Sequence, residues 1–184
     1  MKQYMFLLLG LLVLTTVPLV AQDEEGPAGF EFIVGPRLGV SYVFTTPEDF
    51  TDRVTELFPG AEYFPLYTLF GVNIEQRILL GNTSSHFAFQ EMVLVGGLEQ
   101  SMALPIGALL IGYRDASGFE FGMGPLINFA GVGVVLAIGW TISIQGVYVP
   151  IDISITLPNR ERPTGISLTT GFNFKVRRKM SDTF

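Results

Sequence analysis

The sequence contains no cysteine and only one histidine in 184 residues. The absence of cysteine excludes a disulfide framework, a thiolate nucleophile and a lipid anchor on an N-terminal cysteine. The sequence also has no cluster of metal ligands, no phosphate-binding loop and no dinucleotide fingerprint. We therefore expect neither a metal nor a cofactor.

The first 21 residues have the parts of a secretory signal peptide. Lys2 supplies the positive charge, residues 5–14 are almost purely apolar, and residues 19–21 offer a small residue at the cleavage site. This pattern predicts export and a mature chain that begins near Gln22. The alternative is an uncleaved anchor helix, although the apolar run is shorter than the ~20 residues of a bilayer span.

Charged residues are scarce: they make up 15% of the chain, against 48% hydrophobic residues, and the net charge is −6. This mild acidity argues against a nucleic-acid partner. The composition is also unusually apolar for an exported protein that stays in water. We therefore expect an apolar environment to cover part of its surface.

The long uncharged segment between Glu120 and Asp152 has the two-residue period of a strand. The even positions from 132 to 144 are Val, Val, Leu, Ile, Trp, Ile and Ile, and the odd positions between them are mostly Gly, Ala, Thr and Ser. A helix would spread these small residues over several faces and would not favour the β-branched content. The same alternation recurs and predicts eight strands, near residues 30–44, 63–80, 85–96, 102–113, 118–129, 132–144, 147–157 and 165–176.

The parity of the apolar positions switches where tight hairpins would lie. The apolar face is odd up to Phe129 and even from Val132, which leaves Ala130-Gly131 as a two-residue loop, and the next switch leaves Gln145-Gly146. Both loops have glycine second, where a positive φ is commonly needed. The last switch in parity lies between the odd apolar position Leu157 and the even apolar position Ile166, and it requires a loop of even length. Residues 158–165 supply such a loop of eight residues. The pattern predicts antiparallel, up-and-down strands.

Two segments depart from this alternation. Strict alternation over residues 85–95 would place Glu91 on the apolar face, so we expect a β-bulge near Gln90 to restore the register. Thr46 and Pro47, followed by acids, are typical of a helix start. One face of that helix would carry Phe50, Val54 and Leu57, with Pro59-Gly60 as a stop. We expect a short amphipathic helix across the barrel mouth or in the lipid interface.

The composition of the second strand face indicates which face contacts lipid. It carries Gly, Ala, Ser and Thr with few charges, where the outside of a soluble barrel would be rich in Lys and Glu. An eight-stranded lumen is just filled by side chains, so a narrow barrel in lipid needs bulky residues outside and small ones inside. The outward aromatic residues gather near strand ends, except Trp140, which falls mid-strand. We therefore expect a transmembrane β-barrel over residues 22–176 and a short basic tail over 177–184.

With its signal peptide, eight alternating strands and no cysteine, the chain resembles the small eight-stranded outer-membrane barrels of Gram-negative-type bacteria. The resemblance implies an outer-membrane location, contact with the lipid bilayer and insertion by the barrel-assembly machinery, but no specific activity. The last strand is similar to the insertion signal that this machinery reads, through Thr169, Gly171, Phe174 and Val176. It departs from that signal because Val176 replaces a second aromatic residue and the chain continues to Phe184.

The charged residues of the inner face form the candidate site. They are Glu31, Glu75, Glu120 and Asp152 against Arg37, Arg77 and Lys175, with Asn73 among them. An unpaired charge in the lumen would cost several kcal/mol, so we expect an ion-pair network that fills the lumen. A gated path for protons or small ions is the alternative.

His86 is the one candidate for acid–base chemistry. Ser84, Ser85 and Glu91 lie near it in sequence, and outer-membrane lipid hydrolases of this architecture use Ser, His and an acid. The usual motif order is not matched, and residues 81–85 are typical of a turn. We therefore expect no catalytic residues and no enzyme.

Four functions remain as hypotheses. The first is a non-enzymatic outer-membrane barrel with a structural, adhesion or small-ligand role and an unknown external ligand. The alternatives are a small-solute or lipid transporter or channel, a soluble periplasmic lipid-binding barrel, and an outer-membrane lipid hydrolase.

Overall fold

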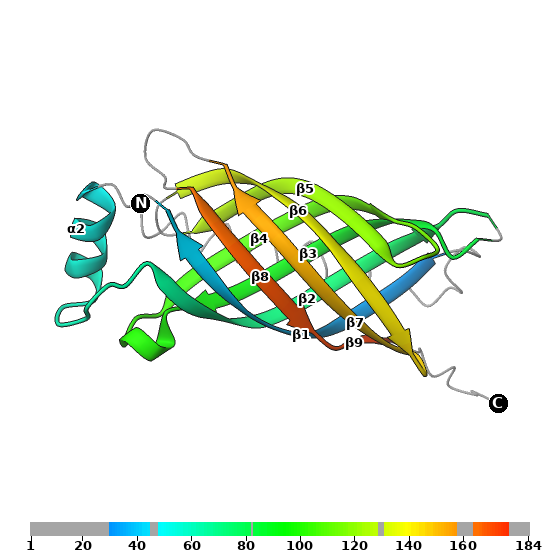
Figure 1. Ribbon diagram of the computed structural model, residues 1–184, viewed down its shortest axis with the longest axis horizontal. Coiled ribbons are helices and arrows are strands. Elements are labelled where there is room, and N and C mark those ends of the chain that lie inside the picture. Colours follow the sequence, from blue (N-terminus) through cyan, green and yellow to red (C-terminus); the bar gives the residue numbers. More distant parts are fainter. Residues whose placement is uncertain (1–29, 45–47, 82, 129–130, 158–163, 177–184) are drawn as a thin grey trace, which may run out of the picture.

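The computed structural model describes residues 30–44, 48–81, 83–128, 131–157 and 164–176. These residues form an antiparallel β-barrel with one α-helix, as Figure 1 shows. The predicted all-β barrel is therefore confirmed. The strands are β1 (Phe30–Val43), β2 (Leu66–Leu79), β3 (His86–Gly96), β4 (Leu104–Arg114), β5 (Phe119–Asn128), β6 (Gly131–Ile144), β7 (Val147–Thr156), β8 (Gly165–Gly171) and β9 (Asn173–Lys175). The helix is α2 (Glu48–Leu57), and a 3-10 turn, η1 (Leu98–Gln100), lies between β3 and β4.

The barrel is closed by β1, which pairs with both β2 and β8. β8 and β9 are two parts of one last strand, interrupted at Phe172, and β9 continues the pairing with β1 and β7. The barrel thus has eight strands, as the alternation predicts. Because it is closed, each of the eight strands in the described part of the chain pairs with a neighbour on both sides.

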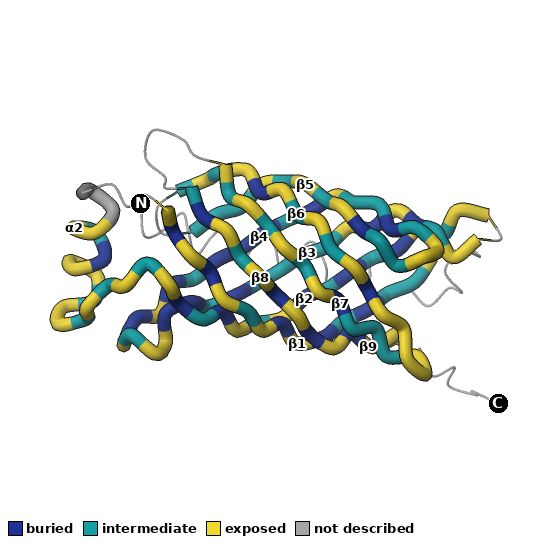
Figure 2. Tube along the Cα trace, in the orientation of Figure 1, coloured by how far each residue is buried: buried dark blue, intermediate teal, exposed yellow. Residues whose placement is uncertain are grey.

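Exposure alternates along the strands with the predicted two-residue period (Figure 2). On β6, Ile138 and Trp140 are 52% and 48% exposed, whereas Thr141 is 6% exposed. Large apolar side chains cover the outside of every full-length strand, and charged side chains such as Arg37 and Glu75 are buried inside. This distribution is the reverse of the one found in a soluble barrel.

β3, which is described throughout, contains no bulge near Gln90, so that prediction was wrong. Its register with β2 and β4 runs without interruption, and Glu91 consequently faces outward. Glu91 is half-buried there, and its Oε1 lies 3.4 Å from Nε2 of Gln76 on the neighbouring strand. The side-chain amide of Gln76 thus lies beside the Glu91 carboxylate on the outer face, which is mostly apolar.

The turn at Gln145-Gly146 is confirmed: φ is 50° at Gln145 and 84° at Gly146, as a two-residue hairpin turn requires. The preceding hairpin differs from its prediction, because Asn128 pairs with Gly131 and Ile127 with Val132. The connection is therefore residues 129–130, which lie outside the described residues, rather than 130–131. Parity could not reveal this difference, since a register change of two leaves every side chain on its own face.

The helix α2 forms in the predicted segment, at the barrel end that also carries η1 (Figure 1). Val54 is fully buried and packs with Met102 and Leu104. Leu57, expected on the same apolar face, is instead 40% exposed. The predicted N-cap, at 45–47, lies outside the described residues. Among those that are described, no helix is long and apolar enough to cross a membrane.

The turn η1 holds the start of β2 in place. The Glu99 carboxylate accepts hydrogen bonds from the hydroxyl of Thr68 and, at 2.8 Å, from its backbone N–H. The Gln100 side chain accepts from the N–H of Phe64 at 2.7 Å and donates to the carbonyl of Leu66 at 2.8 Å. We call this end of the barrel, with α2 and η1, the helix end, and the opposite end the far end.

The β4–β5 turn at the far end is ordered by one carboxylate. Asp115 accepts hydrogen bonds from the hydroxyl of Ser117 at 2.6 Å, from its N–H at 2.8 Å and from the N–H of Phe119 at 3.1 Å. These bonds, the hydroxyl first, hold the pKa of Asp115 below its usual value.

Trp140 packs against the aromatic ring of Phe119, and a second group of aromatic rings lies on β3, β4 and β5. The ring of Trp140 is 6.0 Å from that of Phe119, the first residue of β5, because the register pairs these two residues. The ring of Tyr113 lies 5.8 Å from Phe87 and 6.1 Å from Phe121. β6 runs past the end of β5, so a residue inside β6 is level with a strand end.

Candidate functional site

A cluster of buried charged side chains fills the lumen toward the far end. Glu75, on β2, is fully buried at its centre. Its Oε1 accepts hydrogen bonds from Nε of Arg77 at 2.5 Å and from Nη1 of Arg114 at 2.9 Å. Residues 75 and 77 share the inner face because side chains two apart on a strand point the same way. One carboxylate therefore holds two guanidinium groups.

Arg114 also binds a second carboxylate, that of Glu120 on β5. Its Nε donates to Oε2 of Glu120 at 3.0 Å, and its Nη2 donates to the same oxygen. The hydroxyl of Thr141, on β6, donates to the other oxygen at 2.6 Å. Both carboxylates are thus hydrogen-bonded as well as ion-paired, which is the condition for keeping charges buried.

Two further ion pairs extend the cluster. Nη1 of Arg37 lies 3.3 Å from Oδ2 of Asp152, and Nζ of Lys175 donates to Oε1 of Glu31 at 2.5 Å. The side chain of Lys175 is 47% exposed, so the second pair is at the rim. In the described strands, the inner face has four carboxylates and four cations, so its formal charges are equal in number.

Some buried polar groups in the lumen have no hydrogen-bond partner among the described residues. They include the side-chain amides of Asn73 and Asn173 and the guanidinium nitrogens of Arg37, which is ion-paired with Asp152 without hydrogen-bond geometry. Nη2 of Arg77 and Nε2 of His86 belong to the same set. All are almost completely buried. The interior next to the ion pairs therefore contains buried polar groups whose hydrogen-bonding capacity is not used by the described residues.

The structure brings the residues chosen from the sequence together on the inner face of the barrel. They are Glu31, Arg37, Asn73, Glu75, Arg77, Glu120 and Asp152. Sequence reasoning missed Arg114, because the predicted strand ended at residue 113. Both faces of this strand are apolar in sequence, so the inner face is identified only by the burial of the even-numbered residues from Leu104 to Arg114.

His86 is buried beside this cluster. Its Nε2 lies 3.7 Å from Oε1 of Glu75, and its Nδ1 lies 3.0 Å from the backbone carbonyl oxygen of Ser84. The contact to Ser84 thus involves the main chain rather than the hydroxyl that a nucleophile would need. Glu91 faces the outside of the barrel, away from the histidine. This geometry does not assemble the hydrolase arrangement considered from the sequence.

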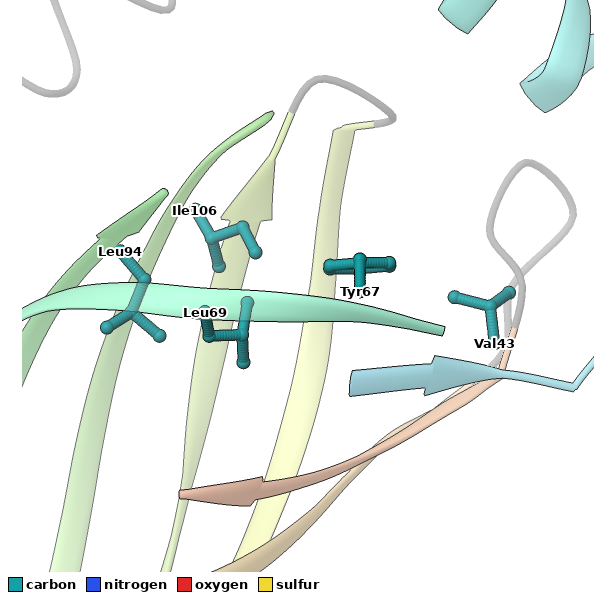
Figure 3. Packing of buried hydrophobic residues seen from close by; sticks show 5 residues of the cluster. All are labelled: Val43, Tyr67, Leu69, Leu94 and Ile106. Carbon is teal, nitrogen blue, oxygen red and sulfur yellow. The ribbon is translucent and has the colours of Figure 1, made fainter. Parts of the chain in front are cut away.

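Toward the helix end, the lumen is apolar, a feature that the alternation did not predict. Figure 3 shows the buried cluster of Val43, Tyr67, Leu69, Leu94 and Ile106 there. A second cluster, of Ala108, Leu110 and Val135, continues it deeper into the barrel. The inner positions thus change along the strands from apolar to charged on β2 and β4, and from apolar to the polar Gln90 and His86 on β3. The lumen has an apolar half and a charged half.

A cavity of about 80 Å³ remains in the lumen between these halves. Its apolar side includes Leu69, Met92, Leu94, Ile106, Ala108 and Leu110. Its opposite side is formed by β7, β8 and β1 and carries the hydroxyls of Ser41, Ser154, Thr156, Ser167 and Thr169. Gln90, Glu120 and Asp152 line it where it meets the charged cluster.

The four residues that resemble an insertion signal divide between the two faces of the last strand. Thr169 and Gly171 are buried on the inner face, whereas Phe174 and Val176 are 50% and 43% exposed on the outside. A Cβ at position 171 would lie 2.1 Å from the carbonyl oxygen of Pro36, so only glycine fits there. Recognition by the assembly machinery stays a prediction.

Gly139→Ala is expected to destabilise the barrel through Asp152. The new Cβ would lie 2.0 Å from Oδ1 of Asp152 and 2.6 Å from the carbonyl oxygen of Ile151, so the carboxylate that pairs with Arg37 must shift. Overpacking of this kind typically costs ~1–3 kcal/mol. Urea unfolding in lipid vesicles measures the loss.

The matched control for this substitution is Gly122→Ala, also on the inner face. Its Cβ would lie 3.6 Å from the nearest atoms, which is ordinary contact, so the free energy of unfolding should change by less than about 0.5 kcal/mol. Equal stability of the two variants would contradict the close packing inferred around Asp152.

Comparison with known proteins identifies no family. No protein-family model and no curated protein sequence matches the chain. Among solved structures, an acetoacetate decarboxylase-like enzyme from Sphingomonas wittichii RW1 aligns with 86% of this chain and 98% of its own at 8% identity. The TM-score is 0.19, so this likeness carries no argument about fold or activity.

Proposed function

We propose that this chain is an integral β-barrel of the bacterial outer membrane, with a filled lumen and a non-enzymatic structural or small-ligand role. The observation that carries the proposal is the reversed distribution of side chains. Apolar residues such as Val132, Ile138 and Leu168 are 59%, 52% and 48% exposed, while Glu75 and Arg37 are almost fully buried. In water, this distribution would be unfavourable on both faces of the sheet.

The size of the exposed apolar surface supports a lipid environment. Large hydrophobic residues are exposed on every full-length strand and thus surround the barrel. Soluble monomers rarely expose contiguous apolar patches beyond a few hundred Å². A lipid bilayer covers such a belt, and the closed sheet meets the requirement that backbone groups in lipid be paired internally. Insertion would then depend on the barrel-assembly machinery of the outer membrane.

The charged cluster supports a role other than conduction. Glu75, Arg114 and Glu120 link β2, β4 and β5 across the lumen, and Arg37 with Asp152 links β1 and β7. An eight-stranded lumen has little room beyond its side chains. Ion pairs that cross the lumen at this level would obstruct a wide water path, so an open channel is not favoured.

Cell fractionation tests the proposed location. We expect the chain to remain with membranes after osmotic shock and to enter solution only with detergent, because its apolar belt is covered by lipid. A periplasmic protein released by the same shock and a known outer-membrane barrel serve as controls. Release of folded chain by osmotic shock without detergent would favour the soluble lipid-binding barrel instead.

A further inference from the structure

Glu91 is the one charged residue on the outer face of the described strands. The register pairs it with Ile74 on β2 and Leu109 on β4, and all three residues lie near the middle of their strands. In a transmembrane barrel this level falls near the centre of the bilayer, where a carboxyl group is costly to expose to hydrocarbon. Glu91 is therefore expected to have a hydrogen-bonding partner.

The chain itself supplies only a weak partner. Among the described residues, the one hydrogen bond to the Glu91 carboxyl comes from the side-chain amide of Gln76, over 3.4 Å. This bond is longer than the ~2.7–3.2 Å of a typical N–H···O bond. Most of the hydrogen-bonding capacity of these two side chains is thus not used by the described part of the chain.

Glu91 and Gln76 together are complementary to a second copy of themselves, since one accepts hydrogen bonds and the other donates them. Their polar ends are 3.4 Å apart, so they lie at nearly the same depth in a membrane. Copies of one chain insert in the same orientation, so a two-fold axis between them runs along the membrane normal and keeps every residue at its own depth. The Gln76 amide of each copy can therefore face the Glu91 carboxyl of the other.

The side chains around this pair allow a close approach of two barrels. The next outer residues of β3 are Val93 and Val95, and the register places Gly107 of β4 beside Val93. The two valines are half-buried and Gly107 is buried, whereas every outward residue of β6 is exposed. Small residues let protein surfaces approach closely in membranes, where packing and hydrogen bonds drive association.

We propose that two copies of this chain associate in the membrane through the outer faces of β2, β3 and β4. At the centre of the interface, Gln76 of each copy donates a hydrogen bond to Glu91 of the other. This inference rests on the proposed membrane location and goes beyond the proposed function by naming a partner.

Energy transfer between donor-labelled and acceptor-labelled full-length chains in phospholipid vesicles measures the association. We expect transfer to rise and saturate as the protein-to-lipid ratio increases. Glu91→Leu removes both intermolecular bonds and makes the outer face fully apolar, so the variant should insert but associate about 10- to 100-fold more weakly. Glu91→Gln keeps a hydrogen-bonding side chain and should stay within about 3-fold of the wild type.

Single cysteines identify the face that forms the contact, because the chain has no cysteine of its own. Val93→Cys lies next to Glu91 on the outer face and should give a disulfide-linked dimer under mild oxidation in vesicles. Ile153→Cys is the matched control, since it is exposed on β7, which lies four strands away from β3 on the other side of the barrel. It should stay monomeric.

The outcomes separate this inference from the proposed function. A chain that folds but does not enter vesicles contradicts the membrane location. An inserted wild-type chain that stays monomeric at every protein-to-lipid ratio overturns the dimer alone. Equal association of Glu91→Leu and the wild type, or cross-linking through position 153 in preference to position 93, shows that this polar pair does not form the interface and also overturns the proposal.

Discussion

Ile138→Arg is expected to prevent most of the chain from assembling into membranes. Ile138 lies inside β6, is 52% exposed on the outer face and is paired with Phe121 and Ile153. A lipid-facing guanidinium in a transmembrane barrel costs ~2–4 kcal/mol at the bilayer midplane and less toward the interfaces. Protein folded in phospholipid vesicles can be measured by its resistance to protease and by the fluorescence of Trp140, the single tryptophan.

Two controls distinguish the faces of β6. Ile138→Val keeps the outer face apolar and should assemble like the wild type. Thr141→Ser keeps the hydroxyl that donates to Glu120 at 2.6 Å on the inner face, so it should also be silent. If Ile138→Arg assembled normally and Thr141→Ser did not, the inside and outside of the barrel would have to be exchanged.

Glu75→Gln is expected to cause the largest loss of stability among the lumen variants. The substitution keeps the shape but leaves Arg77 and Arg114 without their shared, fully buried carboxylate. Removing one partner from a buried ion pair typically costs ~3–5 kcal/mol, since the other charge is left uncompensated. The free energy of unfolding in vesicles, from urea titration with Trp140 fluorescence, measures this loss.

The matched control is Glu31→Gln, at the rim of the same cluster. Glu31 pairs with the half-exposed Lys175 and lies 3.9 Å from Nη1 of Arg77, which keeps its closer partner Glu75, so its loss should cost about 1 kcal/mol, well below the cost of losing Glu75. Planar-bilayer recording adds a second measurement: the wild type should show no steady current, and Glu75→Gln should show brief openings. Wild-type stability of Glu75→Gln, or large stable steps from the wild type, would contradict a lumen held closed by this cluster.

The strand alternation was enough to assign most side chains to a face of the barrel. It placed Ile138 outside and Glu75 inside because a strand has a period of two, whatever its neighbours are. It failed at Glu91 because a polar residue on the apolar face suggested a bulge, whereas the pairing simply places Gln76 within reach. It also placed the hairpin after β5 one residue late, because a shift of two preserves parity.

The sequence by itself determined the eight alternating strands, their antiparallel order and the apolar outer face, because these depend on local periodicity and turn residues. Only the tertiary structure decided which lumen residues meet. The ion pairs of Arg114 with Glu75 and Glu120, and the separation of an apolar half from a charged half, depend on the register of strands distant in sequence. Local patterns carry no information on how far one strand is displaced along the next, and that displacement sets which residues share a level in the barrel.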